Sequence, residues 1–529
     1  MIGELANKDW DVIVIGTGMG GGTVGRRLAE KGLSVLFLER GPNGPRAEQQ
    51  TLDAEMHDPM ARTVRGYWPK PMHAKINGRN SEFFGPVGAG VGGTSVFYAA
   101  ALERPERHDL DHSADRPHPT GGWPVGYDQF QPYYERAEKL FHVSGQPDPL
   151  STERDPLLAD PASLTAGEQA LMQSLRENGL NPYQGHMGVR RKPGCKMCLG
   201  FKCPRACKMD GRSAGVEPAL KTGKAALIDK CVVQNLHANG RRITNVEAVR
   251  EGVSLGFRAR VVVLAAGALS SPRLLLASTS EQQPQGCANE NGLVGKNLMF
   301  HLNEVFALWP KKREADDIAT KAIVFRDHYY ANNRRYGVVQ AMGIDASYGE
   351  IVYFLNNIFD RSILRHVKPL RALTRFPAMA AVRMFGNAKI FTGILEDLPY
   401  ESNRVLLDEN DRDVLRFQYD FKPELLQRRR EFRKLIRRSL RGHRHAFLGL
   451  QPELNFGHPC GTLKFGADPK TSVLDANCRA HGVENLYVAD SSFMPTSFGV
   501  NPSLTIAANA LRVADRIAAD IFNQQPLGS

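Results

Sequence analysis

The chain has 529 residues, of which 42% are hydrophobic and 23% charged, and this composition is that of a large globular protein rather than a disordered or fibrous one. No run reaches the roughly 18 uninterrupted apolar residues that suggest a membrane span. The N-terminus has no basic flank before a long apolar run, so we expect no cleaved signal peptide and a cytoplasmic protein. The formal net charge is +12.

A nucleotide-binding pattern opens the chain. An apolar, β-branched run over 11–16 predicts a parallel strand buried on both faces, and it leads directly into Gly16-Thr-Gly18-Met-Gly-Gly21. A predicted helix over 24–31 and a predicted strand over 34–38 follow, and this strand ends at Glu39. Gly16 allows a tight turn, Gly18 lets the backbone approach a pyrophosphate, Gly21 permits close packing of helix on strand, and Glu39 can bind an adenosine ribose. The pattern predicts a dinucleotide site without choosing between NAD and FAD.

A second glycine-rich segment covers residues 88–95 and continues into Val-Phe-Tyr98. No apolar strand precedes it, so it does not begin another nucleotide fold. Its flexible backbone suits a loop that wraps around a large planar ligand. An ordinary surface loop is the alternative, and it fits poorly with the apolar continuation.

Four of the eight cysteines are crowded together, at Cys195, Cys198, Cys203 and Cys207. In a reducing compartment, clustered thiols are more often metal ligands than disulfides. The spacing resembles iron–sulfur runs without matching the bacterial ferredoxin pattern. An iron–sulfur cluster is favoured over a structural zinc, and disulfides or packed free thiols are the third alternative.

The middle of the chain predicts a second sheet and two basic stretches. Strands are expected over 305–309, 321–326, 336–342, 389–395 and 405–419, and a long basic helix over 424–445. Residues 361–389 hold five Arg, two Lys and no acid, and residues 427–445 hold eight Arg, one Lys and one Glu. Solvated helix faces and docking to an acidic protein or a membrane surface are about equally expected, whereas nucleic-acid binding is disfavoured. The apolar residues between 353 and 391 are expected to form a core helix pair, with a hydrophobic pocket or membrane contact as alternatives.

The C-terminal region carries three further patterns. Gly457-His458-Pro-Cys-Gly461-Thr462 comes first, and a strand starting at Leu486 then ends in Asp490. Pro502 is predicted at the first position of a helix, where its missing N–H is harmless. The positive end of that helix can face developing negative charge.

Taken in order along the chain, these patterns resemble the glucose-methanol-choline (GMC) oxidoreductase family, of the bacterial dehydrogenase type with a cysteine-rich insertion. The segments that carry the resemblance also include Trp123-Pro-Val-Gly-Tyr-Asp128, Val261-Val-Val-Leu-Ala-Ala-Gly267 and Val294-Gly-Lys-Asn-Leu298. The resemblance implies a mixed α/β and α+β fold, with a Rossmann-like FAD-binding domain at 8–105, 210–300 and 450–525. It further implies a cysteine-rich helical insertion at 106–209 and an antiparallel-sheet substrate domain at 301–449.

The resemblance also implies FAD as the cofactor. Glu39 would bind the ribose, Gly93, Thr94 and Ser95 would lie along the isoalloxazine, and Asp490 would contact the ribityl–pyrophosphate region. Ala266 and Gly267 belong to a matching segment, and the helix after Pro502 would face the flavin. Covalent attachment in some members uses a histidine near the second glycine-rich loop, and residues 84–107 contain none, so we expect non-covalent FAD. Phe97 and Tyr98 stand where many relatives have Asn.

By the same resemblance, His458 and Asn501 occupy the catalytic positions. A neutral imidazole can take the hydroxyl proton of an alcohol near neutral pH, and the Asn amide can orient the same oxygen. We therefore expect FAD-dependent oxidation of a small-molecule alcohol CH–OH group, in a sugar, polyol or other alcohol, with electrons passed to an acidic partner protein. Alternatives are an oxidase that converts O₂ to H₂O₂ and an FAD electron carrier without an alcohol substrate, for which His458 and Asn501 would have no task.

Overall fold

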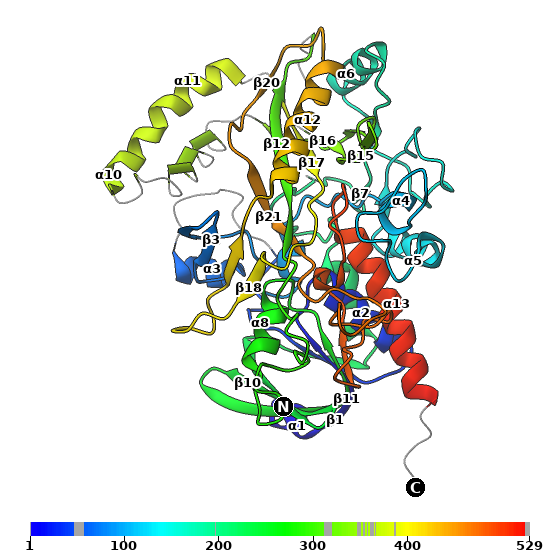
Figure 1. Cartoon of the computed structure of the whole chain (residues 1–529), viewed down its shortest axis with the longest axis vertical. Coiled ribbons are helices and arrows are strands. Elements are labelled where there is room, and N and C mark those ends of the chain that lie inside the picture. The colour runs from blue at the N-terminus through cyan, green and yellow to red at the C-terminus, as the bar shows by residue number, and fades with distance from the viewer. Residues whose placement is uncertain are drawn as a thin grey trace.

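A Rossmann-like parallel sheet forms one half of the molecule (Figure 1). The computed structural model describes residues 2–46, 58–195, 197–311, 320–345, 351–352, 355–356, 358–359, 364, 367–385 and 388–523. The parallel strands run in the order β8 (Ala225–Ile228), β2 (Val35–Leu38), β1 (Asp9–Ile15), β11 (Val253–Leu264) and β22 (Leu486–Val488). The first half of β11 instead pairs antiparallel with β10 (Arg242–Arg250), which pairs with β9 (Cys231–Asn239).

The apolar runs form buried strands because helices cover them. Val12, Ile13 and Val14 of β1 are fully buried, as expected for a parallel strand with both faces covered. Helix α2 (Met19–Glu30) follows β1 and packs against the C-terminal helix α13 (Ser503–Asn523). Segments from both ends of the chain therefore build one nucleotide fold.

The second large sheet is antiparallel and fills the other half of the molecule (Figure 1). Its order is β20 (His445–Phe447), β12 (Met299–Leu308), β17 (Lys389–Leu395), β16 (Val339–Asp345), β13 (Ile323–Phe325) and β6 (Tyr183–Gln184), and β21 (Glu453–Cys460) also pairs with β12. Helix α12 (Pro423–Ser439) covers one face. A Cβ on Gly393 of β17 would lie 2.7 Å from the ring of Phe432 in α12, so helix and sheet are in close contact.

Smaller elements complete the fold. A four-stranded sheet has the order β18 (Arg404–Leu406), β19 (Arg416–Tyr419), β3 (Met72–Ile76) and β4 (Arg79–Phe83). Two short antiparallel pairs are β5 (Val143–Ser144) with β7 (Met187–Gly188), and the hairpin of β14 (Tyr330–Ala331) with β15 (Arg334–Arg335). The remaining helices are α1 (Ile2–Asn7), α3 (Pro59–Arg65), α4 (Arg107–Leu110), α5 (Tyr127–Leu140), α6 (Ala166–Glu177), α7 (Glu217–Lys221), α8 (Ser270–Ala277), α10 (Lys368–Arg371) and α11 (Arg375–Phe385).

The predicted fold class is confirmed, and three local predictions need correction. Residues 405–419 were expected to be one strand of the substrate sheet, but they form β18 and β19 of the four-stranded sheet. The helix expected over 424–445 ends at Ser439, because the chain turns through Gly442 at φ +83° and continues into β20. Pro502 immediately precedes α13 instead of occupying its first position.

The predicted domain ranges remain predictions, since the sheets draw strands from more than one of them. Strand β21 lies within 450–525 yet pairs with β12 of the antiparallel sheet, and β6 joins that sheet from 106–209. Backbone hydrogen bonding across the chain, which no local pattern encodes, determines these pairings.

The apolar segment before β17 does not form the expected core helix pair. Ala378 is the only buried residue of α11, and this helix projects from the body of the molecule with α10 (Figure 1). Residues 353–354, 357, 360–363, 365–366 and 386–387 of this prediction lie outside the described residues. No helix within the described ranges is both long and apolar enough to cross a bilayer.

Candidate active site

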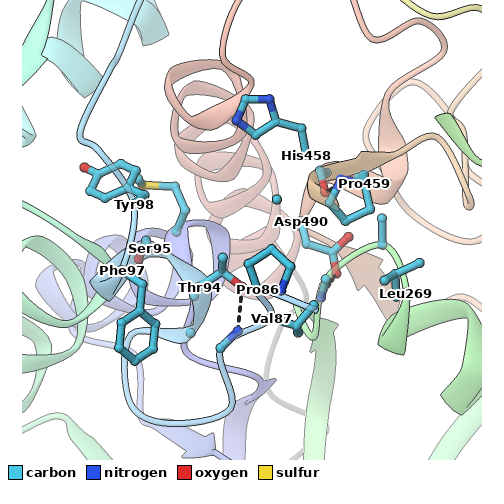
Figure 2. A pocket seen from close by; sticks show the side chains of 18 of the residues that line it. Pro86, Val87, Thr94, Ser95, Phe97, Tyr98, Leu269, His458, Pro459 and Asp490 are labelled. Carbon is cyan, nitrogen blue, oxygen red and sulfur yellow. Dashed lines mark hydrogen bonds between the residues drawn. The ribbon is translucent and has the colours of Figure 1, made fainter. Parts of the chain in front are cut away.

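A cavity of ≈ 570 Å³ is lined by residues of both large sheets. The predicted site residues gather here from positions almost five hundred residues apart (Figure 2). Of the residues predicted to bind FAD or to react, all but Gly21 line the cavity, namely Gly16, Gly18, Glu39, Gly93, Thr94, Ser95, Ala266, Gly267, His458, Asp490, Asn501 and Pro502. The fold therefore brings the separate sequence patterns together at one place.

Glycines shape the nucleotide end of the cavity. Gly16 has φ +93°, and a Cβ there would lie 2.5 Å from the Ala265 carbonyl oxygen. A Cβ on Gly21 would lie 2.0 Å from the Gly16 carbonyl oxygen, so this residue serves the packing of α2 on β1. Gly18, in contrast, has open space at the Cβ position. Its backbone is therefore accessible to a ligand.

Glu39 is buried at the end of β2 and is held by its neighbours. Its carboxylate accepts hydrogen bonds from Thr17 N at 3.1 Å, Thr17 Oγ1 at 2.6 Å and Gly41 N at 3.1 Å. Burial raises the pKa of Glu39 against these lowering hydrogen bonds. A carboxylate has about four acceptor positions. Glu39 therefore keeps capacity for a ribose hydroxyl.

Asp490 has a more structural environment than the resemblance implied. One oxygen accepts from Gly267 N at 2.8 Å and Ser271 Oγ at 2.5 Å, and the other accepts from the Ser492 amide at 2.9 Å and the Ser492 hydroxyl. These four donors fill its usual acceptor positions. Asp490 thus fixes the loop after β11 to the end of β22, and both segments line the cavity.

The second glycine-rich loop forms the short helix η2 (Gly93–Val96) against the cavity. Thr94 Oγ1 accepts from Gly88 N at 3.0 Å, and Ser95 Oγ donates to Gly92 O at 2.6 Å. Phe97 stacks on Tyr67 with ring centroids 3.8 Å apart. The loop is held by hydrogen bonds of its own side chains and by the ring of Tyr67, and such support is expected of a loop that binds a planar ligand.

His458 lies on β21 and is connected to a histidine that the sequence patterns missed. Its Nδ1 is 2.9 Å from Nδ1 of His301 on β12. The Nε2 atom of His301 lies 2.7 Å from the Phe498 carbonyl oxygen and 3.1 Å from that of Ser497. The contact joins residues 157 positions apart. No local sequence signal marks His301, apart from its place shortly after the matched segment that ends at Leu298.

These contacts determine the protonation of both rings. Carbonyl oxygens only accept, so His301 Nε2 carries the proton and His301 Nδ1 is an acceptor. Because His301 is neutral and already donates from Nε2, the Nδ1 atom of His458 must be the donor between the two rings, so Asn455 Nδ2, 3.2 Å from the same atom, cannot donate to it. This leaves His458 Nε2 with a free lone pair. Burial lowers the pKa of His301 to about 4. Burial, with His301 and Lys321 as neighbouring ionisable groups, lowers the pKa of His458 well below its ordinary value, so the ring is neutral near pH 7.

Asn501 directly precedes Pro502 and α13 at the cavity wall. Its Oδ1 is buried without a hydrogen-bond partner among the described residues. The preceding loop is fixed to the antiparallel sheet, because Val338 N donates to the Gly499 carbonyl at 2.8 Å and His301 binds the Phe498 carbonyl. His301 therefore holds both His458 and the loop that carries Asn501. The orphaned amide oxygen points to a ligand in the cavity.

The antiparallel sheet contributes a set of polar side chains at the other end of the cavity. The cross-strand register places those that lie on strands on one face of the sheet, opposite α12. The set comprises Asn303 on β12, Gln340 on β16, Thr392 on β17, Asn455 on β21, and Lys321 just before β13. The sequence patterns did not single out any of them as functional.

The predicted metal centre is not supported. Among the described residues, no group of three or more His, Cys, Asp or Glu side chains is placed to hold a metal ion. All eight cysteines are free. Cys198, Cys203 and Cys207 are buried in a small apolar cluster with Ala100, Met187 and Val189. Burial raises the pKa of Cys207 to about 11, with neighbouring thiols adding to the shift. Packed free thiols are the alternative that agrees with this structure.

Comparisons with known proteins agree with the fold and the site. Two family models described as GMC oxidoreductase match residues 10–303 and 399–510, and the first alone takes in more than half of the chain. Paromamine 6'-oxidase of Streptomyces fradiae is 29% identical, covering 98% of this chain and 93% of that protein. The fructose dehydrogenase large subunit of Gluconobacter japonicus is 25% identical, covering 97% and 98%.

Solved structures share the fold at low sequence identity. Pyridoxine 4-oxidase, described as from Mesorbium loti, has a TM-score of 0.63 and 20% identity, covering 97% of this chain and 99% of that chain. A formate oxidase has a TM-score of 0.68 and 15% identity, covering 97% and 98%. The two family matches, together with the glycine fingerprint and the cavity, show that the chain belongs to the GMC oxidoreductase family and is an FAD-dependent oxidoreductase that acts on CH–OH groups.

Proposed function

We propose that this enzyme oxidises a small alcohol at the cavity, with His458 as the base and with FAD bound non-covalently. The observation that carries the proposal is the His458–His301–carbonyl chain, which leaves the Nε2 lone pair of a neutral His458 free. The residues present fit FAD, since Gly18 and Glu39 lie at one end of the cavity and the orphaned Asn501 amide lies with His458 among its other lining residues.

The chemistry follows from this protonation state. His458 Nε2 accepts the proton of the substrate hydroxyl, and this favours loss of hydride from the carbon that bears the hydroxyl group. FAD, when bound, supplies the two-electron acceptor for that hydride. Asn501 orients the substrate oxygen. The N-terminus of α13, directly after Pro502, stabilises nearby negative charge by ~1 kcal/mol.

The electron acceptor is a separate part of the proposal. A second redox centre at the four cysteines would favour a dehydrogenase, but the structure gives that centre no support. The curated relatives include proteins named oxidase and proteins named dehydrogenase. We propose dehydrogenase activity with a partner acceptor, and reduction of O₂ to H₂O₂ is the alternative. Turnover with an artificial acceptor under argon, compared with H₂O₂ formation in air, separates the two.

The base is tested by His458→Ala. A panel of primary alcohols, sugars, polyols and hydroxy acids first identifies a donor that bleaches the flavin of the wild-type enzyme. The variant should keep its FAD absorbance and lose about 10²- to 10⁴-fold in the rate of flavin reduction. His237→Ala is a matched control, because His237 is exposed on β9 and pairs with Glu247. Reduction of His458→Ala at the wild-type rate would exclude this role for His458.

We also propose that α10 and α11 bind an anionic membrane surface. Phe376 and Met379 of α11 are 64% and 52% exposed, Leu373 in the turn between the two helices is 51% exposed, and residues 361–389 contain no acid. Apolar side chains beside lysines and arginines are the combination that binds the interface of an anionic bilayer. The other basic stretch, 427–445, is a weaker candidate for a membrane-binding surface. Arg428 and Arg429 of α12 are buried, and they contact Glu396 and Glu304 inside the protein.

Sedimentation with vesicles tests the membrane proposal. The enzyme should sediment with vesicles containing phosphatidylglycerol and remain free with phosphatidylcholine alone. The double variant Phe376→Ser, Met379→Ser should bind less, whereas Leu450→Ser should not change binding although Leu450 is 86% exposed. Equal binding by the double variant, or none by the wild type, would contradict the proposal and leave an acidic protein as the partner of this surface.

A further inference from the structure

Lys321 is a buried lysine in the wall of the cavity. The residue is 4% exposed, and it lines the cavity together with His458 and the polar side chains of the antiparallel sheet. Its amine makes no hydrogen bond or ion pair within the described part of the chain. A buried, unpaired ammonium group is unfavourable by several kcal/mol unless something else compensates it. The position therefore points to a ligand.

A second buried lysine shows how this chain stabilises such a group when its role is structural. Lys208 is 1% exposed, and its Nζ donates to the carbonyl oxygens of Val96 at 2.9 Å, Tyr98 at 3.0 Å and Phe201 at 2.5 Å. These three acceptors use all three donors of an ammonium group. Lys321 has no comparable set. Burial therefore does not by itself explain Lys321.

The neighbouring carboxylate does not neutralise Lys321. Glu103 is the carboxylate that acts on the pKa of Lys321. Its oxygens already accept hydrogen bonds from Tyr183 Oη at 3.0 Å, His186 N at 2.8 Å and Arg326 Nη2 at 2.8 Å. Arg326 supplies the positive charge that balances Glu103. The charge of Lys321 is therefore left available to the cavity.

The groups beside Lys321 select hydroxyls. The Oε1 atom of Gln340 is buried without a hydrogen-bond partner in the described residues, and Thr392 lies opposite Gln340 in the strand register. Asn303 and Asn455 complete this polar surface. Amide and hydroxyl groups both donate and accept, as hydroxyl groups of a ligand require.

We propose that Lys321 binds the carboxylate of the substrate, so that the donor is a hydroxy acid. The inference rests on the proposed function for the reaction itself. The hydroxyl proton would pass to His458 Nε2, the carbinol carbon would lose its hydride to the two-electron acceptor that FAD supplies when bound, and the unchanged carboxylate would belong to an oxo acid product. A monoanion fits best, because one ammonium group balances one negative charge whereas phosphate sites usually gather several cations or arginine pairs. Cationic alcohols would be repelled by Lys321.

Binding of acetate and acetamide tests the inference without a known donor. The two probes have the same shape and differ in charge, and their binding is followed by the change in flavin absorbance of the oxidised enzyme. Acetate should bind the wild type at least about tenfold more tightly than acetamide, because a hydrogen bond to a charged group contributes about 1.5–3 kcal/mol. Lys321→Met should lose this preference, and Lys434→Met, on the exposed side of α12, should keep it.

The wild-type enzyme provides an independent measurement if Lys321→Met does not retain FAD. Burial lowers the pKa of Lys321 to about 8, so the ammonium form and acetate affinity should be lost as pH rises through this value. His458 and Glu103 face the same region. The pKa of His458 is well below its ordinary value, and His186 and Arg326 hold the pKa of Glu103 low against burial, so neither titrates near pH 8. Acetamide affinity should not change.

The donors then separate the two levels of the proposal. D-Gluconate should reduce the flavin more efficiently than D-glucitol, and Lys321→Met should reverse the order mainly through KM. Equal acetate and acetamide affinities, or an acetate preference unchanged in Lys321→Met and from pH 7 to 9, would overturn the role of Lys321 while the oxidation of alcohols stands. Failure of the proposed function would give a different result, namely flavin reduction at the wild-type rate in His458→Ala.

Discussion

His301 is the residue that connects the reacting groups. It accepts from His458 Nδ1 and donates to the Phe498 carbonyl oxygen, so one ring fixes the tautomer of the base and the position of the loop before Asn501. Such a residue acts through others and has no contact of its own with the reaction. Its removal should therefore change the rate of the chemical step more than substrate affinity.

We expect His301→Leu to lower the rate of flavin reduction about tenfold or more, because the hydrogen-bond acceptor for His458 is lost. His301→Gln keeps an acceptor oxygen and should recover part of the rate. Rapid-reaction measurements of flavin reduction at saturating donor give the rate, and KM should change little. A change confined to KM would contradict the positioning role.

The pH dependence of the wild type checks the same geometry. The neutral form of His458 is the active one, and its pKa lies well below its ordinary value. Flavin reduction should therefore stay constant as pH falls through about 6.5, the value for an unperturbed histidine. A loss of half the rate at that pH would show that His458 is in an ordinary environment.

Among the elements, β12 and α12 form the support behind the site. Glu304 points from β12 away from the cavity and is fully buried between Arg429 and Arg433 of α12. Three of the seven basic side chains of this helix, those of Arg428, Arg429 and Arg433, therefore bind partners inside the protein. A helix that carries so many arginines reads from sequence as a solvated or docking face, and only the position of Glu304 on the neighbouring strand shows otherwise.

Glu304→Leu should lower the free energy of unfolding by about 3 kcal/mol, because it leaves the buried guanidinium group of Arg429 and the half-buried one of Arg433 without their shared partner. Glu30→Leu removes the exposed pair between Arg26 and Glu30 on α2, and it should change stability by less than about 1 kcal/mol. Denaturant unfolding of the FAD-bound proteins measures both. Similar losses in the two variants would show that Glu304 is better solvated than its burial indicates.

For the whole molecule, the cavity joins segments from Ile15 to Ile506. A ligand that fills it connects the two large sheets, and FAD should therefore stabilise the entire fold. The melting temperature of the apoprotein should rise with FAD concentration. At an FAD concentration of one hundred times Kd, binding adds about 2.7 kcal/mol to the free energy of unfolding. FMN lacks the adenosine end that Glu39 would bind, so it should stabilise less. A melting temperature that does not depend on FAD would contradict this arrangement.

The nucleotide site could be predicted from local sequence patterns. In one strand–helix–strand unit, Gly16 permits the tight turn, Gly21 permits close packing of helix on strand, and Glu39 supplies a carboxylate for a ribose. The spacing of these residues alone therefore indicates a nucleotide site. Resemblance to a family added His458 and Asn501, and the structure places both at the same cavity. The cysteine crowding, in contrast, suggested a metal because spacing records proximity along the chain and not the geometry of thiols in space.

The tertiary structure decided what depends on contacts between distant segments. The proton on His458 is set by His301, 157 residues away, and the free charge of Lys321 is visible only because Glu103 is already occupied. The exposure of α11 likewise depends on which surfaces the rest of the chain covers. Sequence by itself determined the nucleotide fold, since this depends on local spacing, and its resemblance to a family indicated the kind of enzyme. The tautomer, the unpaired lysine and the exposed helix depend on long-range packing, and no local pattern contains that information.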